Sequence, residues 1–286
     1  MSDSLPVDLS DALAEAAPRL GNFADVRYFA ELDSTNDTAL SLAAAGAAEG
    51  TSVLADAQRA GRGRRGHTWF SPPGAGMYLS VVLSPKSPES PGSPKSPESP
   101  MAMALSLVTL AAGVAVAEAV SQTAGLPVEL KWPNDVVIGR PWRKVGGLLC
   151  ESVATGGRIE AVVVGIGINL RSAAYPAEIA DRATSIETEL GRPVDRASLV
   201  VACLGRLRAA VERLRQGRGD EVCREWRQFG RAGLEAAPVR WHEQGAERTG
   251  TARDIAADGA LLVERDGRVE RLIAGEVTWD RLSHDA

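Results

Sequence analysis

The chain has 286 residues, of which 44% are hydrophobic and 24% charged, so it is long and apolar enough to bury a core of its own. Acidic side chains outnumber basic ones by 37 to 32, and the formal charge of −5 argues against a general nucleic-acid-binding protein, which carries a basic footprint over a whole domain. Three cysteines without a CxxC pair argue against a disulfide framework or a structural zinc site. Because the N-terminus has no apolar signal region, we expect the chain to stay in the reducing cytoplasm.

The first third of the chain predicts alternating helices and strands. A helix over 7–17 is expected to stop at Pro18, and the run from Asp33 supplies capping residues for a second helix that ends at Gly46. Runs of β-forming residues predict strands over 25–32, 51–57 and 77–83. The last two of these strands are separated by a long arginine-rich loop over 59–76.

Two unusual segments follow the third strand. Residues 84–100 contain the octapeptide SPKSPESP twice, and proline recurs too often for a helix or a strand ladder to form. We expect a solvated, flexible insertion there, with a Ser-Pro phosphorylation tract or a partner spacer as the functional alternatives. Residues 101–117 are the longest uncharged run, and they fall short of the roughly 20 apolar residues that span a bilayer. They predict a buried core helix and no membrane partner.

The remaining residues divide into the end of a large domain and a small β-rich one. Apolar and amphipathic runs predict strands over 128–131, 135–138, 145–153 and 159–168 and helices over 197–216 and 220–229. Past Leu234, turn signals separate about five short alternating segments, which is typical of a small β-barrel. The expected fold is therefore α+β or mixed α/β over 1–233, with a β-barrel over 234–286.

The loop QRAGRGRRG at 58–66 concentrates positive charge in an otherwise acidic protein. It contains four arginines and three glycines in nine positions, a combination that lets guanidinium forks and backbone amides approach an anion. A solvated basic loop or an RNA contact explains the same composition. Mutual repulsion and the entropy cost of ordering glycine predict disorder until an anion binds. Trp69, just beyond the loop, either closes over that ligand or is a packing residue.

Three further motifs carry cations, amides and glycines. KWPND at 131–135 is either a capped hairpin turn or a cluster of a cation, an amide and a carboxylate. RKVGG at 143–147 places two adjacent glycines at the start of one strand, and GIGIN at 165–169 alternates glycine with isoleucine on the next. Those glycines indicate either a simple strand bend or a face left open for a flat apolar ligand, with Asn169 at its rim.

Taken in order, these motifs resemble those of the biotin–protein ligases. The resemblance rests on QRAGRGRRGHTWFSP (58–72), KWPND, RKVGGLL (143–149) and GIGIN, together with DSTND (33–37), and it extends from about residue 28 to the C-terminus. It implies an α+β fold of the biotin/lipoate ligase type, similar to class II aminoacyl-tRNA synthetases: a mixed β-sheet flanked by helices, followed by a small SH3-like β-barrel. The domain over 1–233 would then be catalytic.

The resemblance also implies a reaction and its participants. Biotin and ATP would form biotinyl-5′-AMP and pyrophosphate. Mg²⁺ would bind together with the ATP phosphates, and the sequence does not identify its protein ligands. A lysine of a biotin carboxyl carrier domain, as in acetyl-CoA carboxylase, would then take the biotin. Joining a carboxylate to a triphosphate requires permanent cations, which the arginine loop supplies. No nucleic-acid partner is expected.

The site residues implied by the resemblance form three overlapping sets. Those expected at biotin are Ser34, Thr35, Asn36, Gln58, Arg62, Gly63, Arg64, Lys144, Gly147, Gly165 and Gly167. Those expected at ATP are Arg62, Arg64, Arg65, Trp69, Asn134 and Asn169. The catalytic candidates are Lys144 between the carboxyl and the α-phosphate, Arg64 over the adenylate, Lys131 as a supporting cation, and Asp135 to orient or deprotonate the acceptor amine.

Several alternatives stay open at this point. The hairpin before Lys144 is longer than the family spacing, so Arg143 competes with Lys144 for the essential position. About 22 residues before the first strand cannot build a winged helix, which predicts a monofunctional ligase without repressor activity. A lipoate–protein ligase and an RNA-binding module are the rival functions. The acceptor carboxylase and the pairing of two chains as a homodimer are not determined.

Overall fold

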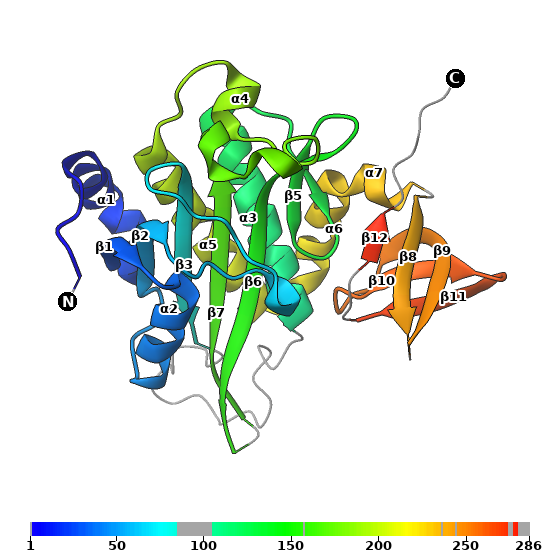
Figure 1. Cartoon of the computed structure of the whole chain (residues 1–286). Coiled ribbons are helices and arrows are strands. Elements are labelled where there is room, and N and C mark those ends of the chain that lie inside the picture. Colours follow the sequence, from blue (N-terminus) through cyan, green and yellow to red (C-terminus); the bar gives the residue numbers. More distant parts are fainter. Residues whose placement is uncertain are drawn as a thin grey trace.

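The computed structural model describes residues 2–84, 105–156, 158–235, 237–243, 245–273 and 277–279. Beyond Ser84, the predicted Ser-Pro insertion lies outside the described residues, as do the first four residues of the predicted helix over 101–117. Figure 1 shows a large layered domain, built around one sheet, and a smaller sheet formed by the C-terminal residues. The predicted division between 233 and 234 falls between the two sheets.

A seven-stranded mixed sheet organises the large domain, in the order β1-β2-β3-β7-β6-β5-β4. Its strands are β1 (Val26–Leu32), β2 (Ser52–Gln58), β3 (Gly76–Leu83), β4 (Glu129–Lys131), β5 (Asp135–Ile138), β6 (Arg143–Thr155) and β7 (Arg158–Asn169). β1 and β2 are parallel and the other pairs antiparallel, which confirms the predicted mixed sheet flanked by helices. Gly147 is opposite Gly167 on β7 and Asp135 on β5, so the register brings three sequence motifs side by side.

Helices cover both faces of this sheet (Figure 1). The described helices are α1 (Val7–Leu20), α2 (Thr35–Ala44), α3 (Leu105–Ala124), α4 (Ile186–Leu190), α5 (Arg196–Arg215), α6 (Gly219–Phe229) and α7 (Arg231–Leu234), with short 3₁₀ turns at Gly21–Ala24, Arg64–Gly66, Ser172–Ala174 and Ala177–Ile179. Strand alternation divides the core between the faces. Leu54 of β2 packs with α1, α3 and α5, whereas its neighbours Val53 and Ala55 pack against α2 on the opposite face.

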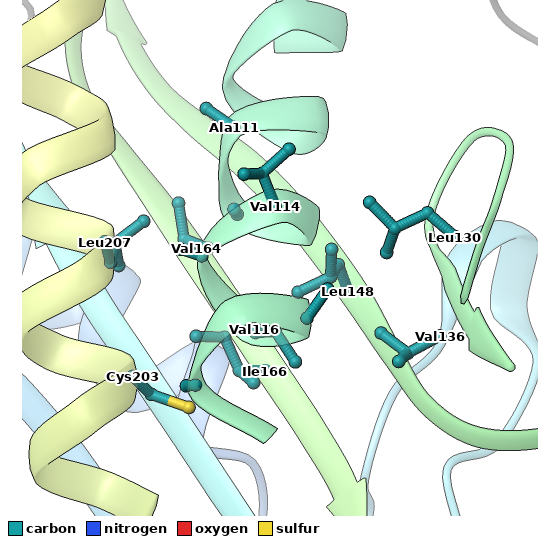
Figure 2. Packing of buried hydrophobic residues seen from close by; sticks show 14 of the residues in the cluster. Ala111, Val114, Val116, Leu130, Val136, Leu148, Val164, Ile166, Cys203 and Leu207 are labelled. Carbon is teal, nitrogen blue, oxygen red and sulfur yellow. The ribbon is translucent and has the colours of Figure 1, made fainter. Parts of the chain in front are cut away.

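Helix α3 is the buried core helix that its composition predicts. Figure 2 shows it beside α5 on one face of the sheet, where side chains from all three meet: Ala111, Val114, Val116, Leu148, Val164, Ile166, Cys203 and Leu207. By length and composition alone α3 could cross a membrane, but 67% of its apolar window is buried inside the protein. It ends later than expected, at Ala124, because Val120 and Ala124 continue the buried surface until Gly125 adopts a φ of +68°.

The predicted end of α1 at Pro18 is wrong. Pro18 lies inside the helix, which continues to Leu20 before Gly21 (φ +57°) ends it. Burial explains the extension: Leu13, Ala16 and Leu20 follow one another at helical spacing on the face that packs against α5. The burial of Leu20 offsets the strain that proline introduces.

The C-terminal residues form the predicted small β domain. Its five antiparallel strands, in the order β11-β10-β9-β8-β12, are β8 (Pro238–Glu243), β9 (Ala246–Ile255), β10 (Leu261–Arg265), β11 (Arg268–Leu272) and β12 (Val277–Trp279). Polar contacts join it to the large domain through the KWPND motif. Trp132 Nε1 donates to the Gly259 carbonyl at 2.9 Å, and Trp279 Nε1 donates to the Trp132 carbonyl at 3.3 Å. The turn that carries Asn134 and Asp135 is therefore held from both domains.

Candidate active site

A cavity of about 360 Å³ lies over β5, β6 and β7 and is lined by residues from every motif that the sequence analysis selected. This volume falls within the roughly 300–1,000 Å³ usual for small-molecule sites. The predicted site residues that line it are Ser34, Thr35, Asn36, Gln58, Arg62, Gly63, Arg64, Arg65, Trp69, Lys131, Asn134, Asp135, Lys144, Gly147, Gly165 and Gly167. Val277 and Thr278 of β12 also line it, so the C-terminal sheet contributes to the same site.

A hydrogen-bonded polar network lies at the N-terminus of α2. Ser34 is the N-cap residue, and its hydroxyl accepts weakly from the backbone N–H of Asp37 at 3.4 Å. Gln58 Oε1 accepts from the backbone N–H of Thr35 at 2.8 Å and from its hydroxyl at 3.1 Å. The other end of the same amide donates to Ser71 Oγ at 2.8 Å. These contacts hold the side chains of β2 and α2 in place as a preformed polar wall.

Asn36 extends this wall to the sheet. Its Oδ1 lies 2.6 Å from Ser80 Oγ on β3, while its Nδ2 donates to Glu151 Oε2 on β6 at 2.8 Å. A Cβ at Gly165 would collide with Asn36 Oδ1, so the glycine is required by the asparagine that packs on it. The sequence analysis expects Gly165 to leave room for biotin. In the structure that room holds the Asn36 amide.

Trp69 lies on the other two glycines of the floor. A Cβ at Gly167 would lie 2.6 Å from Trp69 Cε2, and one at Gly147 would lie 3.2 Å from Trp69 Cζ3. The flat apolar group that the alternating glycines accommodate here is therefore the indole ring. Its Nε1 is buried, and no hydrogen-bond partner reaches it within the described part of the chain. A buried donor without a partner at a cavity wall suits a ligand acceptor atom.

The structure separates Lys144 from Arg143. Lys144 Nζ lies 2.5 Å from Asp135 Oδ1 and 5.4 Å from the centroid of the Trp69 ring, inside the cavity. Arg143 instead pairs with Glu189 of α4 at 2.8 Å and does not line the cavity. Consecutive residues of a strand point to opposite faces of its sheet, so only one of this pair can serve the site. That residue is Lys144.

The arginine loop contributes Arg62, Gly63, Arg64 and Arg65 to the cavity lining. A bridge between Arg62 and Thr68 closes the loop, and the Gly63 N–H donates to the His67 carbonyl at 2.7 Å. Arg65 has a backbone φ of +53°, a left-handed conformation that residues other than glycine rarely adopt. This conformation turns the loop sharply. Arg64 Nη1 lies 3.4 Å from Asn134 Oδ1, which brings the loop to the KWPND turn. The expected ordering of this loop by an anion stays a prediction.

Asn169 is the one predicted site residue that the structure does not bring to the cavity. It is buried, and its Nδ2 donates to the Thr184 carbonyl at 3.0 Å, so it fastens the segment before α4 to the end of β7. Reasoning from sequence also missed Ser71, Ser80 and Glu151. Glu151 had a usable signal, because a lone carboxylate in an apolar strand requires a partner when it is buried.

Comparisons with known proteins agree with this architecture. The pattern of the Biotin/lipoate A/B protein ligase family matches residues 28–169, and that of the Biotin protein ligase C terminal domain matches 239–278. A biotin–[acetyl-CoA-carboxylase] ligase of Mycobacterium tuberculosis is 32% identical over 254 residues, which cover 87% of this chain and 86% of that protein. The bifunctional ligase/repressor BirA of Bacillus subtilis is 37% identical over 175 residues, 60% of this chain and 49% of the relative.

Solved structures show the same fold. The biotin protein ligase from Aquifex aeolicus in complex with biotin and ATP superposes with a TM-score of 0.73 at 27% identity, covering 90% of this chain and 99% of that one. The fold and the cation-lined cavity thus define the class of the protein, a ligase-type domain with a small-molecule cavity over a mixed sheet. The chain belongs to the biotin/lipoate A/B protein ligase family. It spans about half the length of the Bacillus subtilis relative.

Proposed function

We propose that this protein is an ATP-dependent biotin–protein ligase that acts on a biotin carboxyl carrier domain of a carboxylase in the cytoplasm. The observation that supports this most directly is the charge of the cavity. Among the described lining residues there are five cations, Arg62, Arg64, Arg65, Lys131 and Lys144, and one carboxylate, Asp135. Such an excess, in a protein of net charge −5, suits a site where two anions must meet.

In the first step, an oxygen of the biotin carboxylate attacks the α-phosphorus of ATP. The bond from that phosphorus to the pyrophosphate oxygen breaks, and biotinyl-5′-AMP remains. Lys144 stabilises the charge that develops on the α-phosphate oxygens, and Lys131 supports it from the neighbouring turn. Arg64 and Arg65 hold the adenylate phosphate, Gly63 lets the loop backbone approach it, and Trp69 contacts the nucleotide. The polar wall of Ser34, Thr35 and Gln58 receives the ureido ring.

The residues present fit a magnesium ion that arrives with the nucleotide. The described ranges contain no group of three or more acidic, histidine or cysteine side chains that could hold a metal ion, and Asp135 is the one carboxylate among the described residues that line the cavity. Mg²⁺ keeps several waters and commonly uses one or two carboxylates plus substrate phosphates, so this donor set suffices. Bound there beside Asp135 and Asn134, the ion would neutralise charge on the leaving pyrophosphate.

In the second step, the amine of the acceptor lysine attacks the biotin carbonyl, and AMP leaves as an amide bond forms. The amine must lose a proton to complete this attack, and Asp135 lies in the cavity to orient or accept it. Desolvation raises the pKa of the Cys150 thiol to about 11, so this cysteine, which packs against the hydrophobic core and does not line the cavity, stays protonated. No covalent enzyme intermediate is needed.

The proposal is tested by pyrophosphate release from ATP in the presence of the purified chain. Pyrophosphate release should require biotin and should not be supported by lipoate. When a carrier domain is added, that domain should become biotinylated. Release with lipoate alone would instead identify a lipoate ligase. Strongly salt-dependent polynucleotide binding, with no release under any condition, would favour the RNA-binding alternative.

The contact between Gly167 and Trp69 leads to a second prediction. Gly167→Ala should weaken biotin binding by about tenfold or more, because the added methyl group displaces the indole ring toward the ligand space. Calorimetric titration with biotin measures the change. Gly205→Ala on α5 is the control, since its Cβ would make only an ordinary contact of 3.6 Å with Leu20. Equal biotin affinities in the two variants would contradict the assignment of the space beside the Trp69 ring to biotin.

A further inference from the structure

Arg62 is fully engaged by two carboxylates of the chain itself. Its Nη1 donates to Glu151 Oε1 at 2.9 Å and its Nη2 to Glu151 Oε2 at 2.6 Å, a bidentate pair between the loop and β6. The same Nη2 lies 2.6 Å from Asp37 Oδ1 in the first turn of α2. The sequence analysis places this guanidinium over a substrate anion. In the structure it instead fastens the loop to the sheet and to α2.

Glu151 has a second role in the same place. Its Oε2 also accepts from Asn36 Nδ2 at 2.8 Å, and Asn36 Oδ1 lies 2.6 Å from Ser80 Oγ. Ser80 Oγ in turn lies 2.8 Å from Thr35 Oγ1, which donates to Gln58. One half-buried carboxylate therefore touches both the arginine loop and the polar wall at the N-terminus of α2.

We propose that Glu151 is a positioning residue that couples the polar wall to the arginine loop, so that filling the wall and closing the loop stabilise each other. Arg62 then serves to anchor the loop, and charge neutralisation falls to the other cavity cations. The inference rests on the proposed function for the identity of the ligand as biotin. Linkage requires the coupling to be reciprocal, and couplings of this kind amount to about 5- to 150-fold in affinity.

The test compares Glu151→Gln with Glu31→Gln. Glutamine at 151 retains an acceptor for Asn36 but loses the charged bidentate pair with Arg62. The control removes an ion pair of the same loop, Arg59 with Glu31 at 3.1 Å, which is exposed and whose two residues do not line the cavity. Two measurements are made on the full-length chain: biotin affinity by calorimetry, and tryptic cleavage after the loop arginines, identified by mass spectrometry, with and without biotin.

We expect Glu151→Gln to raise the Kd and the KM for biotin about tenfold, to leave kcat at saturating biotin within about twofold, and to speed loop cleavage even without ligand. Glu31→Gln should do none of these. Introducing Glu151→Gln into an Arg62→Gln background should add less than about twofold, because the pair is already broken. If Glu151→Gln acted only by impairing folding, its effect would persist in the Arg62→Gln background. The double-mutant comparison therefore separates a folding defect from the loss of this ion pair.

Two results would overturn the inference in different ways. If the wild-type chain binds biotin and Glu151→Gln matches it in affinity and in protection of the loop, Glu151 has no coupling role and the proposed function stands. If the wild-type chain gives no heat with biotin, the proposed function fails and this inference fails with it.

Discussion

Replacing Lys144 with alanine is expected to slow biotinyl-5′-AMP formation by roughly 10²–10³-fold, the usual loss when one preorganised donor to a developing oxyanion is removed. Lys144 lies in the cavity beside Asp135 and the Trp69 ring, and the proposed function puts its ammonium between the biotin carboxylate and the α-phosphate oxygens. Pyrophosphate release at saturating biotin and ATP measures the effect. Biotin affinity should fall much less, because the polar wall does not depend on this cation.

Arg143→Ala is the matched control for this prediction. It removes the neighbouring positive charge from the same strand, but Arg143 pairs with Glu189 outside the cavity. Adenylate formation should therefore stay near the wild-type rate. If Arg143→Ala were the inactive variant and Lys144→Ala the active one, the assignment of the essential cation would be reversed.

Arg64→Ala is expected to fail in a different way, by letting the adenylate escape. A charge-assisted hydrogen bond contributes about 1.5–3 kcal/mol, so losing one to the adenylate phosphate should speed its release by roughly 10- to 100-fold. Arg64 lines the cavity where the arginine loop meets Asn134. Adenylate formation should be much less affected, because Lys144 is still present.

The released adenylate can be detected by what it acylates. A bystander protein without a carrier domain should become biotinylated on surface lysines when it is mixed with Arg64→Ala, ATP and biotin. Arg59→Ala serves as the comparison, since Arg59 belongs to the same loop but pairs with Glu31 and Asp33 on the exposed surface. Equal bystander labelling by both variants would show that Arg64 does not retain the intermediate.

Particular residues show how far sequence reasoning reaches in this chain. The strands and helices followed from periodicity and capping, and the ordered motifs were specific enough to indicate the family on their own. The end of α1 was misjudged because a local rule about Pro18 was overridden by burial of Leu20, which depends on α5, far along the chain. The predicted site residues other than Asn169 line one cavity, and their roles toward the substrates stay predictions.

The amino-acid sequence by itself determined the two β-containing domains, the buried helix and the collection of cations, amides and glycines at the site, because each depends on residue type and local spacing. Only the tertiary structure decided which cation faces the cavity, what covers each glycine and which charges are already paired. Those outcomes depend on strand register and on contacts between residues distant in sequence, such as Arg62 with Glu151 and Gly167 with Trp69. A one-residue change in register would exchange Lys144 for Arg143, and local patterns alone do not determine register across the sheet.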